Sequence, residues 1–214
     1  MSGAGAAGGD FVEVRDEPRH RRRFEDDLVR VYDVLIEPGD TTLYHRHTED
    51  TFYVAVNEAT VRDRTLGDEE ARTGTAPAGT LLCRPHRSRP LIHQVSNVGS
   101  APIRLIGAEK KASPAVTSSE PLDAPGHVLA LDREPLRAYE LSLEPGQSTG
   151  EIEYRFSSLT VMLTIASLRI RQADGVERIA TFAPGDVIWL PHPTTLTVTN
   201  VGEEGCRAAV GEWR

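Results

Sequence analysis

An internal repeat constrains the fold of this chain more than any other sequence feature. The segment VRVYDVLIEPGDTT begins at Val29, and the similar segment LRAYELSLEPGQST begins at Leu136, half a chain later. The residues Arg30, Tyr32, Glu37, Pro38, Gly39 and Thr42 recur unchanged as Arg137, Tyr139, Glu144, Pro145, Gly146 and Thr149. Such a duplication predicts two structural units with one shared fold.

Both halves carry the pattern of short β-strands. Runs rich in Val, Ile, Leu and Thr are separated by turn segments such as PGD, PGQ, NVG and ADG, and strong helical periodicity is absent. The pattern predicts an all-β chain of two tandem β-sandwiches or barrels. We expect a flexible leader and first edge strand over 1–20, one unit over 21–112, a linker over 113–128 and the second unit over 129–214.

Charge and composition limit the classes of partner. The 214 residues carry a net charge of −8, and the one basic cluster, RHRRR at 19–23, is followed directly by EDD, so no nucleic-acid partner is expected. The chain lacks a long apolar run, a secretion signal and a Cys pattern for zinc or disulfides, which predicts a cytoplasmic protein without a membrane partner. Exposed sheet edges make a homodimer plausible.

Three histidines are candidate metal ligands. His45 and His47 share one face of a predicted strand, about 6.6–7 Å apart. His93 lies in a second predicted strand, LIHQVSN. Three neutral imidazoles that converge can bind Fe, Mn, Ni, Cu or Zn and leave coordination positions open. Taken by itself, a His-x-His pair in a strand is more often a polar row that faces solvent than a metal site.

The spacing around these histidines resembles the two motifs of the cupin superfamily. The first motif begins with Gly, five residues and His-x-His, and the second combines Gly, five residues and Pro with a later His, three residues and Asn. The chain matches these patterns at Gly39, His45, His47, Gly79, Pro85, His93 and Asn97. The segment between Pro85 and His93 is three residues longer than the motif, which implies a wider turn.

The second half keeps the motif spacing and lacks the ligands. Ile152 and Tyr154 stand in place of His-x-His, and Leu196 stands where the histidine of the second motif belongs. Apolar side chains cannot bind a metal. The chain therefore resembles a bicupin, with two tandem jelly-roll-like β-barrels and a metal motif in the N-terminal barrel alone.

The resemblance implies a centre of three histidines that binds one divalent metal, with Fe(II) favoured over Mn, Ni, Zn or Cu. The glutamate of the cupin motif is replaced by Thr51, and Glu49 is the candidate for a fourth ligand because it shares the strand parity of His45 and His47. Such centres are similar to those of thiol, diketone and gentisate dioxygenases. Neutral ligands leave the metal charge uncompensated, which favours a small anionic substrate.

Other functions are compatible with the same ligands. Lewis-acid chemistry of an isomerase, epimerase or lyase, through Zn, Mn or Ni, is equally compatible with this ligand set, and a non-catalytic cupin would use the histidines to line a ligand pocket. A structural role like that of seed-storage bicupins is a further alternative, although those chains are far longer.

Several further residues are candidates for the site. Tyr53 shares the parity of the ligands and is the candidate catalytic residue, because its hydroxyl could donate a hydrogen bond to a substrate. The candidate substrate-binding residues are Arg84, Arg104 and His86. We expect Asn97 to stabilise a turn. The remaining histidines, His20, His127 and His192, are expected to face solvent.

Overall fold

The computed structural model describes residues 11–214, which form β-strands and one short 3-10 helix, η1 (Val14–Asp16). The all-β, jelly-roll-like architecture expected from the sequence is confirmed. The flexible leader predicted at the N-terminus falls mainly on residues 1–10, outside the described residues. Among the described residues, no helix is long and apolar enough to cross a membrane.

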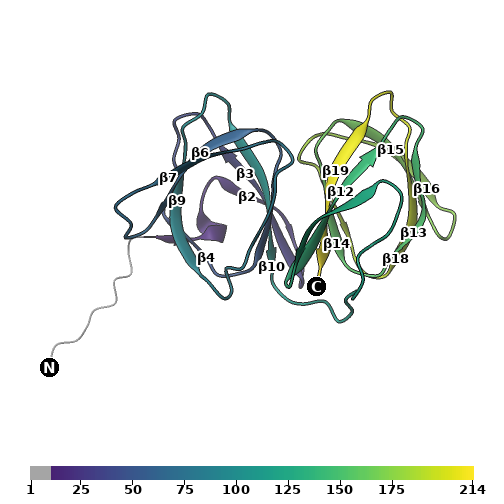
Figure 1. Cartoon of the computed structure of the whole chain (residues 1–214), viewed down its shortest axis with the longest axis horizontal. Coiled ribbons are helices and arrows are strands. Elements are labelled where there is room, and N and C mark those ends of the chain that lie inside the picture. The colour runs from purple at the N-terminus through teal and green to yellow at the C-terminus, as the bar shows by residue number, and fades with distance from the viewer. Residues whose placement is uncertain (1–10) are drawn as a thin grey trace.

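The first half consists of two facing five-stranded sheets (Figure 1). The outer sheet has the order β1-β4-β9-β6-β7 and the inner sheet the order β2-β3-β10-β5-β8. The outer strands are β1 (Val12–Glu13), β4 (His45–His47), β9 (Leu91–Asn97), β6 (Ala59–Thr65) and β7 (Arg72–Ala76). The inner strands are β2 (His20–Glu25), β3 (Val29–Ile36), β10 (Ile103–Lys110), β5 (Thr51–Ala55) and β8 (Leu81–Arg84).

The second half repeats this arrangement with one strand fewer. Its inner sheet has the order β11-β12-β19-β14-β17, and its outer sheet has the order β13-β18-β15-β16. The inner strands are β11 (His127–Arg133), β12 (Leu136–Leu143), β19 (Cys206–Trp213), β14 (Ser158–Met162) and β17 (Val187–Leu190). The outer strands are β13 (Ser148–Tyr154), β18 (Thr194–Asn200), β15 (Ala166–Gln172) and β16 (Glu177–Phe182).

A pair of asparagines shows how closely the halves correspond. The side-chain amide of Asn97 donates to the carbonyls of Ile36 and Ala101, and its Oδ1 accepts from the Gly99 N–H. In the second half, Asn200 makes the same three bonds, with Leu143, Glu204 and Gly202. The turn-stabilising role predicted for Asn97 is confirmed, and its repetition identifies it as part of the scaffold.

The two halves pack together through their inner sheets (Figure 1). The shared core includes Val31, Phe52, Ile106, Ala138, Leu159 and Trp213. Strand β3 is buried on both faces, since Val31 belongs to this core while Val34 belongs to the separate core of the first half. Gly211 lies so close to the Phe52 ring that an added Cβ would be 2.9 Å from it. This interface therefore depends on tight packing between the halves.

A buried polar triad explains why an arginine and a tyrosine are repeated. The Tyr32 hydroxyl donates to Glu109 at 3.0 Å, and Arg30 Nη1 donates to the same carboxylate oxygen at 3.0 Å. The equivalent triad of the second half consists of Arg137, Tyr139 and Glu212. Because the triad is present in both halves, including the half that lacks the histidines, it belongs to the fold rather than to the chemistry of the site.

Candidate metal centre

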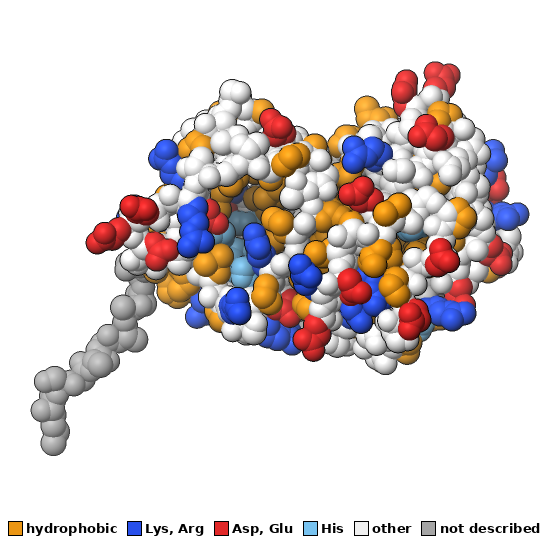
Figure 2. All heavy atoms as spheres, in the orientation of Figure 1, with side chains coloured by type: hydrophobic (Ala, Val, Ile, Leu, Met, Phe, Trp, Pro, Cys, Tyr) orange, Lys and Arg blue, Asp and Glu red, His pale blue; other side chains and the backbone are white. Residues whose placement is uncertain are grey.

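A cavity of about 220 Å³ lies between the two sheets of the first half. Its polar lining consists of His20, Thr42, His45, His47, Tyr53, Asp63, Thr80, Arg84, His86 and His93. The rest of the lining is aliphatic, from residues such as Val34, Ile36, Leu82, Val95 and Leu105. Figure 2 shows a hollow in the surface of this half, with histidine side chains at its floor. The cavity thus combines a polar cluster with an apolar wall.

Strand pairing brings the three candidate ligands together. His45 and His47 are both buried, with the partly exposed Arg46 between them on the opposite face of β4. The neighbouring strand β9 places His93 directly opposite His45 in the antiparallel register. As a result, one nitrogen from each of the three rings lies within 4.8 Å of the other two. The interpretation of the pair as a solvent-facing row is wrong, because both rings are almost completely buried.

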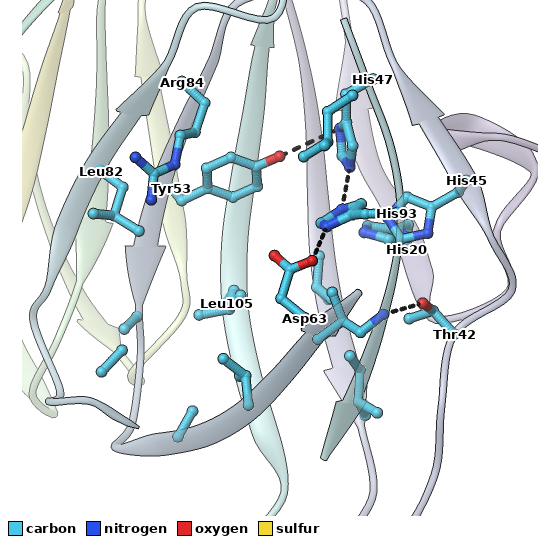
Figure 3. A pocket seen from close by; sticks show the side chains of 18 of the residues that line it. His20, Thr42, His45, His47, Tyr53, Asp63, Leu82, Arg84, His93 and Leu105 are labelled. Atoms are coloured by element: carbon cyan, nitrogen blue, oxygen red, sulfur yellow. Dashed lines mark hydrogen bonds and ion pairs between the residues drawn. The ribbon is translucent and has the colours of Figure 1, made fainter. Parts of the chain in front are cut away.

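Each of the three rings is held through its Nδ1, and Figure 3 shows these contacts for His47 and His93. His45 Nδ1 lies 2.9 Å from the Leu43 carbonyl, which can only accept, so this nitrogen carries the proton. His93 Nδ1 lies 3.0 Å from the Asp63 carboxylate, and His47 Nδ1 lies 3.3 Å from the Tyr53 hydroxyl. Hydrogen bonds of this kind fix the tautomer in metal sites and leave the Nε2 lone pair free for the ion.

The geometry of the free nitrogens fits a divalent metal. His47 Nε2 and His93 Nε2 are 3.2 Å apart. Two nitrogens that bind one zinc-like ion at about 2.0–2.1 Å, at angles from octahedral to tetrahedral, lie about 2.9–3.4 Å from each other. Imidazole nitrogens suit Fe, Ni, Cu and Zn. The donor set and its spacing therefore fit a first-row divalent ion.

Burial keeps the ligands in the neutral form that metal binding needs. Burial, reinforced by the charges of His20 and His93, lowers the pKa of His45 to about 3. The pKa of His47 is also lowered well below its ordinary value, mainly by burial. Burial lowers the pKa of His86 to about 4 and raises the pKa of Tyr53. Around neutral pH, the cavity therefore presents uncharged His45 and His47 rings and a protonated phenol.

Three of the predicted site residues line the cavity. The Tyr53 hydroxyl contacts His47, as described above, and the His86 ring stacks on His47 with centroids 4.8 Å apart. Arg84 also lies in the lining, on β8 next to Tyr53 (Figure 3). The wider turn that follows Pro85 therefore brings His86 over the histidine cluster.

Two other predicted residues are placed elsewhere. Leu105 lines the cavity, so the adjacent Arg104 projects from the other face of β10. Its guanidinium pairs with Asp33 at 2.9 Å and donates to the Pro184 carbonyl of the second half at 2.7 Å. The expectation that Arg104 binds substrate in the cavity is thus corrected, because the residue joins the two halves. The Glu49 carboxylate accepts from Arg87 Nη2 at 2.6 Å and lies outside the group of three histidines.

Sequence reasoning missed two cavity residues, Asp63 and His20. Asp63 lies on β6 two residues before Thr65, which pairs with His93. Because residues two apart share one face of a strand, this spacing was the available signal. His20 was expected to face solvent because it lies among arginines, but its side chain is only 7% exposed. Its Nδ1 is 3.1 Å from Glu17, a fully buried carboxylate whose position no motif indicated.

The second half lacks these ligands in space as well as in sequence. Ile152 pairs with Leu196 across β13 and β18, at the positions that His45 and His93 occupy in the first half. Both side chains are buried in an apolar core. His127 and His192, which were expected to face solvent, are partly buried, since the His127 Nε2 contacts the Tyr154 hydroxyl and the His192 Nδ1 is buried.

Removal of the Asp63 carboxylate should weaken metal binding without removing a ligand. In Asp63→Ala, His93 loses the acceptor that fixes its tautomer, so we expect the affinity for Zn(II) to fall about 10–100-fold. Competition with a chromogenic chelator measures this change. Asp63→Asn, which retains an acceptor oxygen, should lose less, and equal affinities for Asp63→Ala and the unmodified protein would contradict the assigned role of Asp63.

No protein-family model matches this sequence, and no curated protein matches it. Solved structures are similar in fold. Salicylate 1,2-dioxygenase from Pseudoaminobacter salicylatoxidans, in adducts with gentisate, is 16% identical with a TM-score of 0.61 over 87% of this chain and 68% of its own. Oxalate decarboxylase from Bacillus subtilis is 12% identical with a TM-score of 0.62 over 94% and 76%. AerE from Microcystis aeruginosa is 10% identical with a TM-score of 0.56 over 92% and 98%. Identities this low establish a shared fold and leave the activity of this chain open.

Proposed function

We propose that this chain, whose fold is that of the bicupins, is a metal-dependent enzyme that acts on a small anionic molecule in its N-terminal half. The observation that carries the proposal is the convergence of three imidazoles, each held through its Nδ1, at the polar end of a cavity. Scaffold residues recur in both halves, whereas the histidine cluster occurs in one half only. This contrast supports a chemical role for the cluster.

The cavity residues can be assigned separate roles. A bound divalent ion would supply Lewis acidity and, in the case of iron, redox chemistry at its open positions. Arg84 would pair with an anionic group of the substrate. The aliphatic wall, which includes Val34 and Leu105, would cover the apolar body of the substrate and exclude water. With His47 donating its Nδ1–H to the Tyr53 oxygen, the Tyr53 hydroxyl would donate to a group in the cavity.

Dioxygenase-type chemistry with Fe(II) is the proposed reaction class. It is supported by three histidines without a carboxylate among the described residues of the compact ligand group, and by the fold shared with salicylate 1,2-dioxygenase. The similarity to oxalate decarboxylase supports a second candidate, a metal-dependent lyase. The two candidates differ in the consumption of oxygen.

Metal analysis combined with an oxygen electrode tests the proposal. Protein purified without chelator should hold about one divalent metal per chain, and Fe(II)-loaded protein should consume oxygen with an acid from a panel that includes gentisate, salicylate and oxalate. Release of CO2 without uptake of oxygen would favour the lyase. The proposal fails if the purified protein contains no divalent metal and added Fe(II) neither binds nor raises the melting temperature.

Arg84 should contribute to anion binding and not to metal binding. We expect Arg84→Met to weaken the binding of gentisate to the metal-loaded protein about tenfold, because the lost bond is a charge-assisted one at an exposed position. Calorimetry measures this affinity, and metal content should be unchanged. Arg87→Met is the matched control, since Arg87 lies on the turn that follows β8 and pairs with Glu49 outside the cavity. An equal loss of gentisate affinity in both variants would show that the effect comes from the removal of a positive charge and not from a direct contact of Arg84 with the anion.

A further inference from the structure

His20 resembles the three candidate ligands in its environment. It comes from β2, a strand of the opposite sheet, and its ring faces the cavity beside His45 (Figure 3). Its Nδ1 is held by the buried Glu17 carboxylate, in the same way as the other rings are held. Burial alone would raise the pKa of Glu17, but hydrogen bonds from His20 and from the backbone of Arg19 and Leu43 lower it to about 2. The acceptor for His20 is therefore a carboxylate anion.

The Glu17 carboxylate also connects His20 with the metal motif. It accepts a hydrogen bond from the Leu43 N–H at 3.2 Å, and the Leu43 carbonyl in turn lies 2.9 Å from His45 Nδ1. One buried anion thus positions His20 directly and the segment that holds His45 indirectly. This arrangement links the position of His20 to that of His45.

The second half contains a twin of His20 whose Nε2 has a partner. His127 occupies the equivalent position, since it begins β11 and pairs with Leu141, as His20 begins β2 and pairs with Val34. The Nε2 of His127 lies 3.2 Å from the hydroxyl of Tyr154. Tyr154 stands at the position of His47. In the first half, that phenol is replaced by an imidazole, so the partner of the His20 Nε2 has to come from another source.

We propose that His20 is the fourth nitrogen ligand of the metal centre. The inference rests on the proposed function, because it requires a metal at the three-histidine cluster. The ion would take the place that the Tyr154 hydroxyl fills in the second half, as the partner of the Nε2. A fourth imidazole also accounts for the loss of the cupin glutamate at Thr51, whose hydroxyl donates to the Glu49 carbonyl.

The spacing of His20 from two of the three rings, those of His45 and His47, fits this assignment. Rings that bind one ion through Nε2 at about 2.0–2.1 Å have centroids about 4.5 Å apart in adjacent positions and about 6.4 Å apart in opposite ones. The His45–His93 and His47–His93 centroids are 4.6 and 5.1 Å apart. His20 is 4.8 Å from His45 and 6.2 Å from His47, as expected for adjacent and nearly opposite positions. His20 lies outside the compact group of three, so its ring has to turn toward the ion on binding.

Electron spin echo spectroscopy of the Cu(II)-loaded full-length protein tests the proposal, because it counts coordinated imidazoles. The unmodified protein should show four, and His20→Ala should show three. The affinity of His20→Ala for Zn(II) should fall more than about 100-fold, beyond the effect of losing a residue that only orients a ligand. His127→Ala is the matched control and should leave both the imidazole count and the Zn(II) affinity unchanged.

Measurements on the unmodified protein keep the test decisive if His20→Ala fails to fold. With 15N-labelled histidine, loading with Zn(II) should shift the Nε2 resonances of four rings, including His20. Shifts confined to three rings, or an unchanged imidazole count in a folded His20→Ala, would overturn the fourth ligand and leave the proposed function intact. If the unmodified protein binds neither Cu(II) nor Zn(II), the proposed function itself fails, and the assignment of His20 fails with it.

Discussion

Replacing His45 with alanine should abolish tight metal binding by this protein. The ring of His45 is 1% exposed, and its Nδ1 is held by the Leu43 carbonyl, so no other side chain can move into its place without repacking β4. We expect the metal content of purified protein to fall from about one ion per chain to none, and the Zn(II) affinity to fall more than about 100-fold.

The same variant should lose the stabilisation that metal gives to the folded protein. A ligand present at 1,000 times its dissociation constant stabilises the native state by about 4 kcal/mol. Urea unfolding with and without Zn(II) should show a stabilisation of this order for the unmodified protein and none for His45→Ala. Ile152→Ala is the matched control, since it truncates the equivalent buried position of the second half. It should unfold more easily yet respond fully to Zn(II). If His45→Ala still bound Zn(II) tightly, the three-histidine cluster would not be the metal site, and the proposed function would lose its basis.

Truncation of Glu212 should cause the largest loss of stability among substitutions outside the site. The carboxylate is fully buried, accepts from Tyr139 at 2.6 Å and pairs with Arg137 at 3.2 Å, and Arg137 itself is 2% exposed. Glu212→Ala would leave the Arg137 charge buried without this partner, which costs about 3–5 kcal/mol. Urea unfolding of the metal-free protein measures this loss without a contribution from metal binding.

The first half supplies the control for this prediction. Glu109→Ala breaks the equivalent triad, but Arg30 is more exposed than Arg137 and keeps an ion pair with Glu25 at 2.9 Å, whereas the ion pair that Arg137 keeps, with Asp132, is longer at 3.4 Å. Its side chain is 18% exposed, so water can solvate the remaining charge. We therefore expect a smaller loss for Glu109→Ala than for Glu212→Ala. If Glu212→Ala unfolds within about 1 kcal/mol of the unmodified protein, the triad does not stabilise the fold as argued here.

The sequence predicted those parts of the site that depend on local periodicity. Because side chains alternate along a strand, the spacing of His45 and His47 was sufficient to place both on one face, and the same parity placed Tyr53 in the cavity. The cupin-like spacing around His93 connected the third histidine with this pair. Arg104 shows the limit of this reasoning, since it could be placed in a strand while the face on which it lies remained undetermined.

Residues brought to the site by pairing between distant strands escaped the sequence analysis. Asp63 reaches His93 through the register of β6 against β9, and His20 reaches the cavity because η1 and the start of β2 pass beside β4. No local pattern distinguishes His20 from the arginines that follow it. Its side chain is buried together with that of Glu17, three residues earlier, which contacts its Nδ1.

What the sequence determined by itself is the duplicated all-β scaffold and the half that carries the imidazoles, because repeats, turn residues and strand parity are properties of short segments. The tertiary structure decided which polar groups hold the imidazoles, which charges line the cavity and which ones join the halves. These choices depend on the register between strands far apart in the chain, where a shift of one residue turns every side chain to the opposite face.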